Sequence, residues 1–434
     1  MSVPLDRLYH YLADVVNHDL VIYRWTPHGS KKLCDLKMLK GRSYIEGHVL
    51  PIMICHDQEP LDFYAWTSEE FEQRVIQDYQ NSNRELFACD AVAKHHARWH
   101  LRSVVANAFN FYDTTLLLHS EKNSKDLVHY QKAGFVPVYY WSHAVIAGDW
   151  FRYAEHDQQL DSAKKHIVKN FLIYNRAWAG TREYRLYFTE QIAESGLSQH
   201  CEMSFNCHDN DGHYRQHQFT NPAFQITNFN LEDFFPANTH TANASADYSY
   251  QDYQSTAIEI VLETVFDDTR WHLTEKTLRP IACGQPFMLC ATPGSLRYIR
   301  EYGFETFDGL IDESYDDVVD AQARLHSIIN EMQRIQQLPA DQQHRLHSQL
   351  AEISRRNQQR FFSTEFQQQV IQELQQNFAQ GITVMNQHRT GKKFSECVAL
   401  YESIPGYHEW QHSNNFRSPQ DYQQVLDELA KCIK

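Results

Sequence analysis

The chain has 434 residues, of which 42% are hydrophobic and 13% are aromatic. This length exceeds that of a usual single domain, so we expect two domains, each with its own packed core. The net charge of −15 argues against a generic nucleic-acid-binding protein, because phosphates attract an excess of positive charge. Residues 1–150 contain 15 Lys/Arg and 18 Asp/Glu, so most of the negative charge lies further along the chain and a basic face on the first domain stays open.

The sequence contains no stretch of about 18 apolar residues, and its first residues, MSVPLDRLYHYLADVV, are charged and amphipathic. We therefore expect neither a signal peptide nor a membrane span. The nine cysteines are an odd number and include no C-x-x-C pair. This pattern is typical of free thiols in a reducing cytoplasm, which is the expected location.

The first 150 residues contain four short runs rich in β-branched and aromatic residues: DLVIYRW, HVLPIMICH, TTLLLHS and FVPVYYW. Helical patterns at residues 68–79 and 90–109 separate the second run from the third. Buried strands that alternate with helices predict a parallel, doubly wound sheet. Residues 143–166 are predicted to form an exposed helix and a connector leading out of this domain.

A second α/β pattern begins with the predicted strand HIVKNFLIYN and continues with the helix REYRLYFTEQIAESG, which ends at Gly196. CEMSFN and TAIEIVLETV are further predicted strands. Residues 207–253, rich in Asn, Asp, His, Ser and Thr, are predicted to be loops. Beyond Asp312, DDVVDAQARLHSIINEMQRIQQL and a Gln-rich stretch to Asn377 predict long helices, because Gly and Pro are few there.

The most informative segment is LTEKTLRPIACGQPFMLCATPGSLRYIREYGF, at residues 273–304. It predicts a helix capped by Thr274 and closed by Gly284, then a buried strand PFMLCA and a second helix beginning near Ser295. Amides at a helix start favour anions, and Glu275 and Lys276 lie beside them. A carboxylate can accept ribose hydroxyls and an ammonium can neutralise a diphosphate, so this pair suits a sugar nucleotide. The alternative is a solvated helical pair.

The TEK segment resembles the donor-binding motif of the α1,3-fucosyltransferase family, in which Thr-Glu-Lys opens the helix that holds the nucleotide diphosphate and ribose. Most of the chain is also similar to glycosyltransferase-like proteins of phages and bacteria, which carry similar TEK, HDQEPL, YYWSH and YNRAW–GTREYR blocks. If the chain is phage-encoded, its location would be the host cytoplasm. The sequence lacks a G-x-G-x-x-G or Walker loop, which disfavours NAD-dependent and P-loop alternatives.

These resemblances imply the GT-B architecture, an α/β fold with two Rossmann-like domains facing a cleft and extra C-terminal helices. We expect an acceptor domain at residues 1–155, a nucleotide-sugar donor domain at 156–400 and a helical extension at 401–434. The donor would be a nucleotide-diphosphate sugar, with no metal or other cofactor required.

FLIYNRAWAGTREYRLYF, at residues 171–188, places Asn175, Arg176 and Arg182 between a predicted strand and a helix. It resembles the fucosyltransferase segment whose arginine contacts the donor diphosphate, and Arg182 matches best although the loop is one residue longer. A guanidinium at a helix start can add bidentate phosphate contacts. The alternative is a surface arginine that pairs with Glu183 or Glu190.

IMICHDQEPLDF, at residues 52–63, ends an apolar strand with His56, Asp57 and Glu59. Ligands in such sheets bind at the carboxyl ends of the strands, so these side chains would face the cleft. An inverting transfer needs a base near the acceptor hydroxyl, and Asp57 or Glu59 could supply it. The fucosyltransferase loop with the base glutamate has a different spacing, and an acidic turn that leaves the strand at Pro60 is an equal alternative.

Three further residues could line the cleft. His143 could orient acceptor or donor phosphate, or could be a buried histidine bonded to the backbone. Ser120 and Glu121 close a strand and could line the cleft or cap a helix.

The pattern Asp209-x-Asp211 matches a metal-holding triplet of the other major glycosyltransferase architecture. Because Asn, Asp and Gly are ordinary turn residues, the turn interpretation is favoured.

The predicted function is transfer of a sugar from a nucleotide-diphosphate sugar to an acceptor hydroxyl. The phage-type resemblance implies a 5-hydroxymethylpyrimidine in phage DNA as the acceptor. Basic segments at residues 31–42 and 94–102 support DNA, although such segments are more often solvated helix faces. The alternatives are a fucosyltransferase-like enzyme acting on a surface or protein glycan, and a non-catalytic protein that binds a glycan or a nucleotide sugar.

Overall fold

The computed structural model of the chain divides into two units. One comprises His143–Val370, and the other comprises Pro4–Ser142 together with the chain from Ile371 onward, so the second division falls within helix α14 (Thr364–Gln387). The predicted domain limits at 155 and 400 stay predictions, because they lie outside the described residues. The structure describes residues 11–12, 19–25, 34–39, 49–55, 60–61, 115–132, 135–145, 165–209, 212–227, 230–235 and 248–387.

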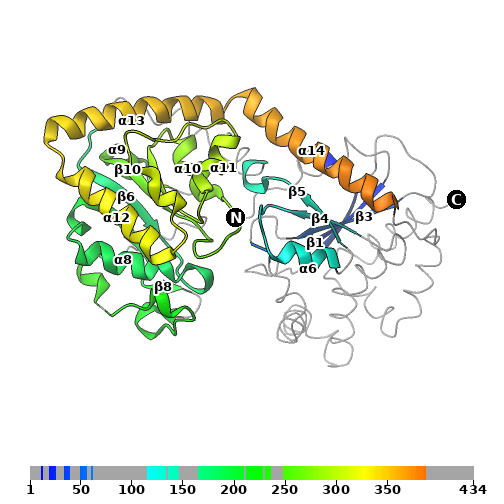
Figure 1. The fold of residues 1–434 in the computed structure, drawn as a ribbon, viewed down its shortest axis with the longest axis horizontal. Coiled ribbons are helices and arrows are strands. Elements are labelled where there is room, and N and C mark those ends of the chain that lie inside the picture. The colour runs from blue at the N-terminus through cyan, green and yellow to red at the C-terminus, as the bar shows by residue number, and fades with distance from the viewer. Residues whose placement is uncertain are drawn as a thin grey trace. The chain divides into compact units, whose positions relative to one another are not determined.

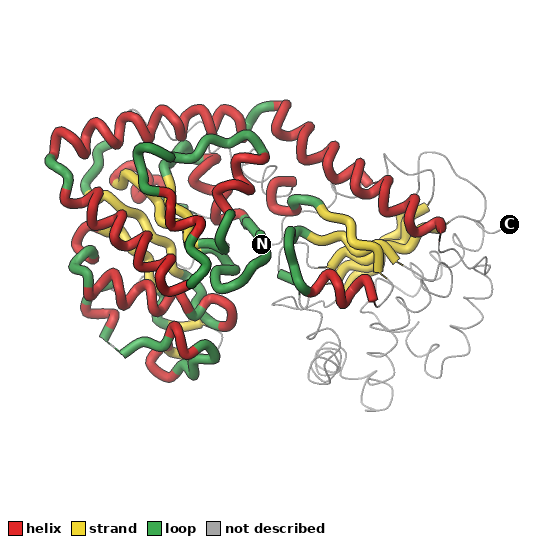
Figure 2. The backbone as a smooth tube through the Cα atoms, in the orientation of Figure 1, coloured by secondary structure: helices red, strands yellow, loops and turns green. Residues whose placement is uncertain are grey.

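The unit that contains the N-terminal part of the chain is built on a five-stranded sheet (Figure 2). The order is β2-β1-β3-β4-β5; β1, β3, β4 and β5 run parallel, whereas β2 pairs antiparallel with β1. The four predicted strands are therefore confirmed. Their bounds, with that of β2, are β1 Asp19–Trp25, β2 Cys34–Leu39, β3 Val49–Cys55, β4 Thr115–His119 and β5 Phe135–Tyr139.

Strand β2 corrects two expectations, since the sheet is not wholly parallel and part of the basic segment at 31–42 is a strand rather than a helix face. The reason is readable in CDLKML, where apolar and polar residues alternate as they do in a strand with one face buried. The two strands are close in sequence, and a parallel pair would need a long crossover connection between them, so antiparallel pairing is favoured. The helical patterns at 68–79 and 90–109, with the basic segment at 94–102, lie outside the described residues.

Helix α14 packs on this sheet through its C-terminal part. A Cβ at Gly381 would lie 2.6 Å from Val138 Cγ2 and 3.0 Å from Leu116 Cδ2, so only glycine permits this close approach. Asn377 Nδ2 donates a hydrogen bond to the Tyr139 carbonyl at 2.9 Å. The sheet also carries the short helix α6 (Asp126–Lys132), which packs beside β5.

The other unit is built on a four-stranded, wholly parallel sheet with the order β11-β10-β6-β7 (Figure 2). The chain moves from β6 outward to β7 and later from β10 outward to β11, so the order reverses between β6 and β10. Right-handed crossovers in opposite directions place helices on both faces of the sheet. All four strands were predicted; their bounds are β6 Lys169–Asn175, β7 Cys201–Phe205, β10 Thr256–Leu262 and β11 Phe287–Cys290.

The helices of this unit lie around that sheet, with α10 packed against α13 and α12 against α8 (Figure 1). The predicted helix after β6, the two helices of the TEK segment and the long Gln-rich helices are confirmed. In the described part of the chain, no helix combines the length and apolar character needed to cross a membrane. The helices are α8 Tyr184–Glu194, α9 Tyr250–Ser255, α10 Glu275–Ala282, α11 Ser295–Glu301, α12 Ala321–Gln337 and α13 Ala340–Phe361.

The segment predicted as loops, 207–253, also contains short regular elements. A two-stranded hairpin joins β8 (His208–Asp209) to β9 (Gly212–His213), and three 3-10 turns follow it. Helix α9 begins within the segment because Ser249 accepts a hydrogen bond from Asp252 N and so caps it. The chain is a mixed α/β protein in both units.

A buried ion pair joins helix α10 to strand β10. Glu259 on the strand is fully buried and pairs with Arg279 on the helix, and Tyr253 donates a hydrogen bond to the same carboxylate. Arg279 Nε also donates to the Tyr253 hydroxyl at 3.2 Å. Because each buried charge has a partner, this network fixes the position of α10 on the sheet.

Helix α12 is tied to its neighbours by Arg324, whose side chain is 1% exposed. Its guanidinium donates to the carbonyls of Ala291 (3.0 Å), Phe266 (2.6 Å) and Val318 (2.7 Å). The guanidinium carbon lies 4.2 Å from the centre of the Phe266 ring, which is a cation–π contact. One side chain therefore satisfies backbone groups of three separate segments.

We expect Arg324→Ala to lower the free energy of unfolding by about 3–5 kcal/mol, because it leaves a cavity and several buried carbonyls without donors. Urea denaturation followed by circular dichroism measures this. The control is Arg345→Ala on α13, since Arg345 is exposed and pairs with Asp341 on the same helix. That control should change stability by less than about 0.5 kcal/mol. Equal losses in both variants would contradict the role given to Arg324.

Candidate functional site

The order reversal between β6 and β10 marks the edge where ligands bind in open parallel sheets, at the carboxyl ends of the strands. Helix α10 starts near this edge as the sequence predicts. Thr274 is its N-cap and accepts a hydrogen bond from Lys276 N at 3.3 Å. At the other end Gly284 has φ +65°, and Gln285 N donates to the Pro280 carbonyl at 2.8 Å, which completes a Schellman motif.

The start of α10 is held by Glu263, the residue that follows β10, whose side chain is fully buried. One carboxylate oxygen accepts from Thr274 N (3.0 Å) and Thr277 Oγ1 (2.5 Å). The other accepts from Thr274 Oγ1 (2.8 Å) and Thr264 N (3.1 Å). Four donors thus satisfy this carboxylate, which locks the first turn of the helix to the end of the strand.

Lys276 and Glu275 lie side by side, each with a side chain 16% exposed. Lys276 Nζ donates to Glu275 Oε1 at 2.9 Å and lies 3.2 Å from the hydroxyl oxygens of Thr264 and Thr274. The second oxygen of Glu275 lies 3.2 Å from His143 Nε2. The structure therefore brings His143, Glu275 and Lys276 together at the start of α10, so that two nitrogen-bearing side chains flank one carboxylate.

The chain leaving β6 is fixed from inside the protein. Asn175 is fully buried, and its Nδ2 donates to Thr189 Oγ1 (2.9 Å) and to the Arg185 carbonyl (3.2 Å). The Arg185 guanidinium is buried as well, and donates to the carbonyls of Ala177 and Glu263. Asn175 and Arg185 thus position the loop between β6 and α8 relative to the end of β10.

Arg182 lies in this loop, in a 3-10 turn just before α8. Its Nε donates to the Ala179 carbonyl at 3.1 Å. Asp209 Oδ2 accepts from Trp178 N (2.7 Å) and Ala179 N (2.8 Å), so the carboxylate of the Asp209-x-Asp211 triplet shapes the loop. Arg176, half-buried, directly follows β6.

The two carboxylates considered as partners of Arg182 both bond to the 217–227 segment. Glu183 accepts from Thr220 N at 2.7 Å, and Glu190 accepts from Thr227 N at 2.6 Å. Both side chains are buried. Their main effect is therefore to hold that segment against helix α8.

The remaining predicted residues either belong to the other unit or cannot be placed. His56, Asp57 and Glu59 fall outside the described residues. Ser120 and Glu121 belong to the other unit, where the Ser120 hydroxyl accepts from Ser142 N (3.1 Å) and Glu121 accepts from a backbone amide. These bonds are typical of residues that shape a turn at the end of a strand.

A group of three side chains in the described regions could hold a metal ion, namely Cys207, His213 and Glu232, whose ligand atoms lie within 4.8 Å of one another. His213 Nε2 lies 3.1 Å from Glu232, and Tyr214 donates to the same carboxylate at 2.6 Å. Arg215 also pairs with Glu232. Burial raises the pKa of Cys207 to about 11, so its thiol is protonated at neutral pH. The protein itself thus satisfies the carboxylate of this group.

Comparisons of the chain with protein-family models, with curated proteins and with solved structures found no match. The functional assignment therefore depends on the geometry at the start of α10. Two residues of that geometry, Glu263 and Arg185, were not predicted. A glutamate at the end of the apolar run TAIEIVL could have pointed to Glu263, whereas no sequence signal separates Arg185 from a surface arginine.

We expect Thr274→Val to lower the free energy of unfolding by about 1–3 kcal/mol, because valine keeps the shape but neither caps α10 nor donates to Glu263. Thr274→Ser keeps the hydroxyl and should lose clearly less. Urea denaturation of both variants gives the comparison. Equal losses would mean that the hydroxyl does not hold the helix start.

Proposed function

We propose that the chain is a glycosyltransferase that takes a sugar from a nucleotide-diphosphate donor. The observation that carries the proposal is the position of Lys276 and Glu275 in the first turn of α10, close to the sheet edge where the strand order reverses. The helix start carries the positive end of the helix dipole, and the Lys276 side chain adds a positive charge beside it. These features suit the diphosphate of a nucleotide sugar.

The proposed donor contacts follow from the partners that each group has now. Two of the three Lys276 contacts are neutral hydroxyls. A phosphate oxygen in place of one hydroxyl would form a stronger, charge-assisted hydrogen bond. Lys276, Arg182 and the helix amides would then stabilise the negative charge that develops on the leaving diphosphate. Glu275 would accept the ribose hydroxyls, with His143 holding its second oxygen.

The proposal includes the GT-B architecture, in which this unit binds the donor and the other α/β unit supplies the acceptor side. Support comes from the parallel strands in the sheet of each unit and from the resemblance of the TEK segment to the fucosyltransferase motif. The proposed location is the cytoplasm. The proposed acceptor is a 5-hydroxymethylpyrimidine in DNA, and the alternatives are a surface or protein glycan, or binding without catalysis.

We expect Lys276→Ala to weaken donor binding about 10- to 150-fold, which corresponds to the loss of a charge-assisted hydrogen bond of about 1.5–3 kcal/mol. A thermal-shift screen of UDP and GDP sugars identifies the donor, and calorimetry then gives its dissociation constant for each variant. Arg345→Ala removes a positive charge from α13 and should bind the donor like the wild type. Unchanged donor affinity and turnover in Lys276→Ala would refute the donor site.

The catalytic base is tested with Asp57→Asn and Glu59→Gln, which keep size and remove basicity. If the reaction inverts configuration, one variant should lose about 10²- to 10⁴-fold in rate while it still binds the donor. Full activity in both variants would exclude these residues as the base.

The acceptor is tested by transfer of radiolabelled sugar, measured in parallel on hydroxymethylcytosine DNA, unmodified DNA and free glycans. Label on glycans alone would exclude the DNA acceptor.

A further inference from the structure

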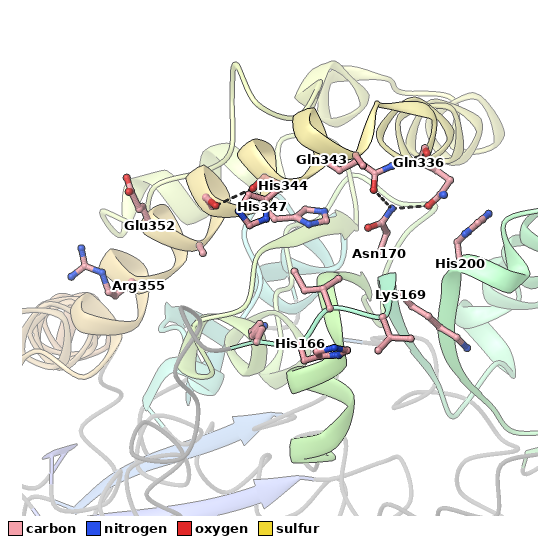
Figure 3. Close-up of a pocket in the computed structure, with 16 residues that line it drawn as sticks. His166, Lys169, Asn170, His200, Gln336, Gln343, His344, His347, Glu352 and Arg355 are labelled. Carbon is pink, nitrogen blue, oxygen red and sulfur yellow. Dashed lines mark hydrogen bonds between the residues drawn. The ribbon is translucent and has the colours of Figure 1, made fainter.

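A cavity of about 810 Å³ lies in the same unit as the donor motif but at the opposite end of the strands. Its wall includes Lys169, which begins β6, whereas the donor motif lies near the carboxyl ends of the strands. Helix α13 forms one side of this cavity, and the chain entering β6 forms the other (Figure 3). We call it the α13 groove; its volume is in the range of small-molecule sites.

The α13 groove is positively charged although the chain as a whole carries −15. Among the described residues that line it, Glu352 is the only acid, against two lysines, one arginine and four histidines. Figure 3 shows Glu352 and Arg355 at one end of the groove and Asn170 and His200 towards the other. The basic lining residues are Lys165, His166, Lys169, His200, His344, His347 and Arg355.

The ammonium of Lys165 has a neutral partner, the side-chain oxygen of Gln285. Burial lowers the pKa of Lys165 to about 8, so it is still mostly protonated at neutral pH. Glu259, whose charge acts on Lys165, is already paired with Arg279. Within the part of the chain that the structure describes, Lys165 is thus a desolvated positive charge without a carboxylate of its own.

Two further groups lack an anionic partner. The side chain of Arg355 forms no ion pair or hydrogen bond with the residues that the structure describes. His347 Nε2 is buried, and it has no hydrogen-bond partner there. Burial, together with His344 and Lys165, lowers the pKa of His347 to about 4, so its ring is neutral at pH 7 and can offer one N–H. By contrast, Lys169 pairs with Glu202 at 3.1 Å.

We propose that the α13 groove binds a ligand that carries two or more phosphate groups. Lys165 would neutralise one phosphate, and Arg355 could contact another bidentately at the end of the groove that it occupies. The ring N–H of His347 would donate between them. This site is separate from the proposed donor site and does not depend on the proposed function.

The test uses the full-length chain and titrates inorganic tripolyphosphate by calorimetry at low salt. Arg355→Gln and Lys165→Gln should each weaken binding about tenfold or more, because each removes a charge-assisted contact. Lys165→Arg keeps the charge and should retain binding. Arg345→Gln, on the same helix but outside the groove, should bind like the wild type, and urea denaturation checks that each variant is folded.

The Lys276→Ala variant separates the two sites, since tripolyphosphate could also occupy a donor diphosphate site. Binding that persists in Lys276→Ala and is lost in Arg355→Gln supports the α13 groove. Binding that is lost in Lys276→Ala and unchanged in Arg355→Gln overturns it, as does no binding to the wild type.

The source of the phosphates is distinguished by adding a nucleoside triphosphate and the bare nucleoside. Groove-dependent binding of the nucleoside triphosphate with clearly higher affinity than tripolyphosphate identifies a nucleotide, and equal affinity identifies an inorganic oligophosphate. Equal affinity for the bare nucleoside overturns the proposal, because the phosphates would then contribute nothing.

Discussion

The buried carboxylate of Glu263 is the constraint on which the candidate site depends. It faces four donors, two of them from Thr274, and so joins the end of β10 to the first turn of α10. A buried carboxylate is stable only when its oxygens accept hydrogen bonds, so loss of any of these donors would leave a costly unpaired acceptor in the core. Because of this arrangement, Glu275 and Lys276 occupy fixed places although their side chains are partly exposed.

The loop after β6 is fixed by the same kind of interaction, in which a buried polar group serves several backbone atoms. Asp209 accepts from two backbone amides of this loop, and Arg185 donates to the Ala177 carbonyl in it and to the Glu263 carbonyl beyond β10. The Glu259–Arg279 pair adds a third anchor beneath α10. Preorganised groups of this kind bind a ligand without a large loss of conformational freedom, which is the main advantage of building a site on rigid elements.

The sequence predicted the elements around the site because each has a local signal. Gly284 ends α10, and Ser295 begins α11 after a Pro-Gly turn. The strand at 34–39 was missed because the basic residues of the surrounding segment, 31–42, outweighed its alternating pattern. Arg185 and the α13 groove could not be foreseen, since both depend on which residues meet through tertiary packing. The groove joins residues 165–170 to residues 340–355, and no local pattern connects segments so far apart in sequence.

Helix α10 has only eight residues, and each of its ends is connected to one of the two proposed sites. Its first turn carries Lys276, and Gln285, which completes its Schellman motif, accepts the hydrogen bond from Lys165 in the α13 groove. A ligand that drew Lys165 away from the Gln285 side chain would act on the residue that closes the helix whose N-terminus lies at the proposed donor site. By thermodynamic linkage, any effect of one ligand on the affinity for the other must be equal in both directions. Through this one short helix, binding at either proposed site would change the affinity of the other.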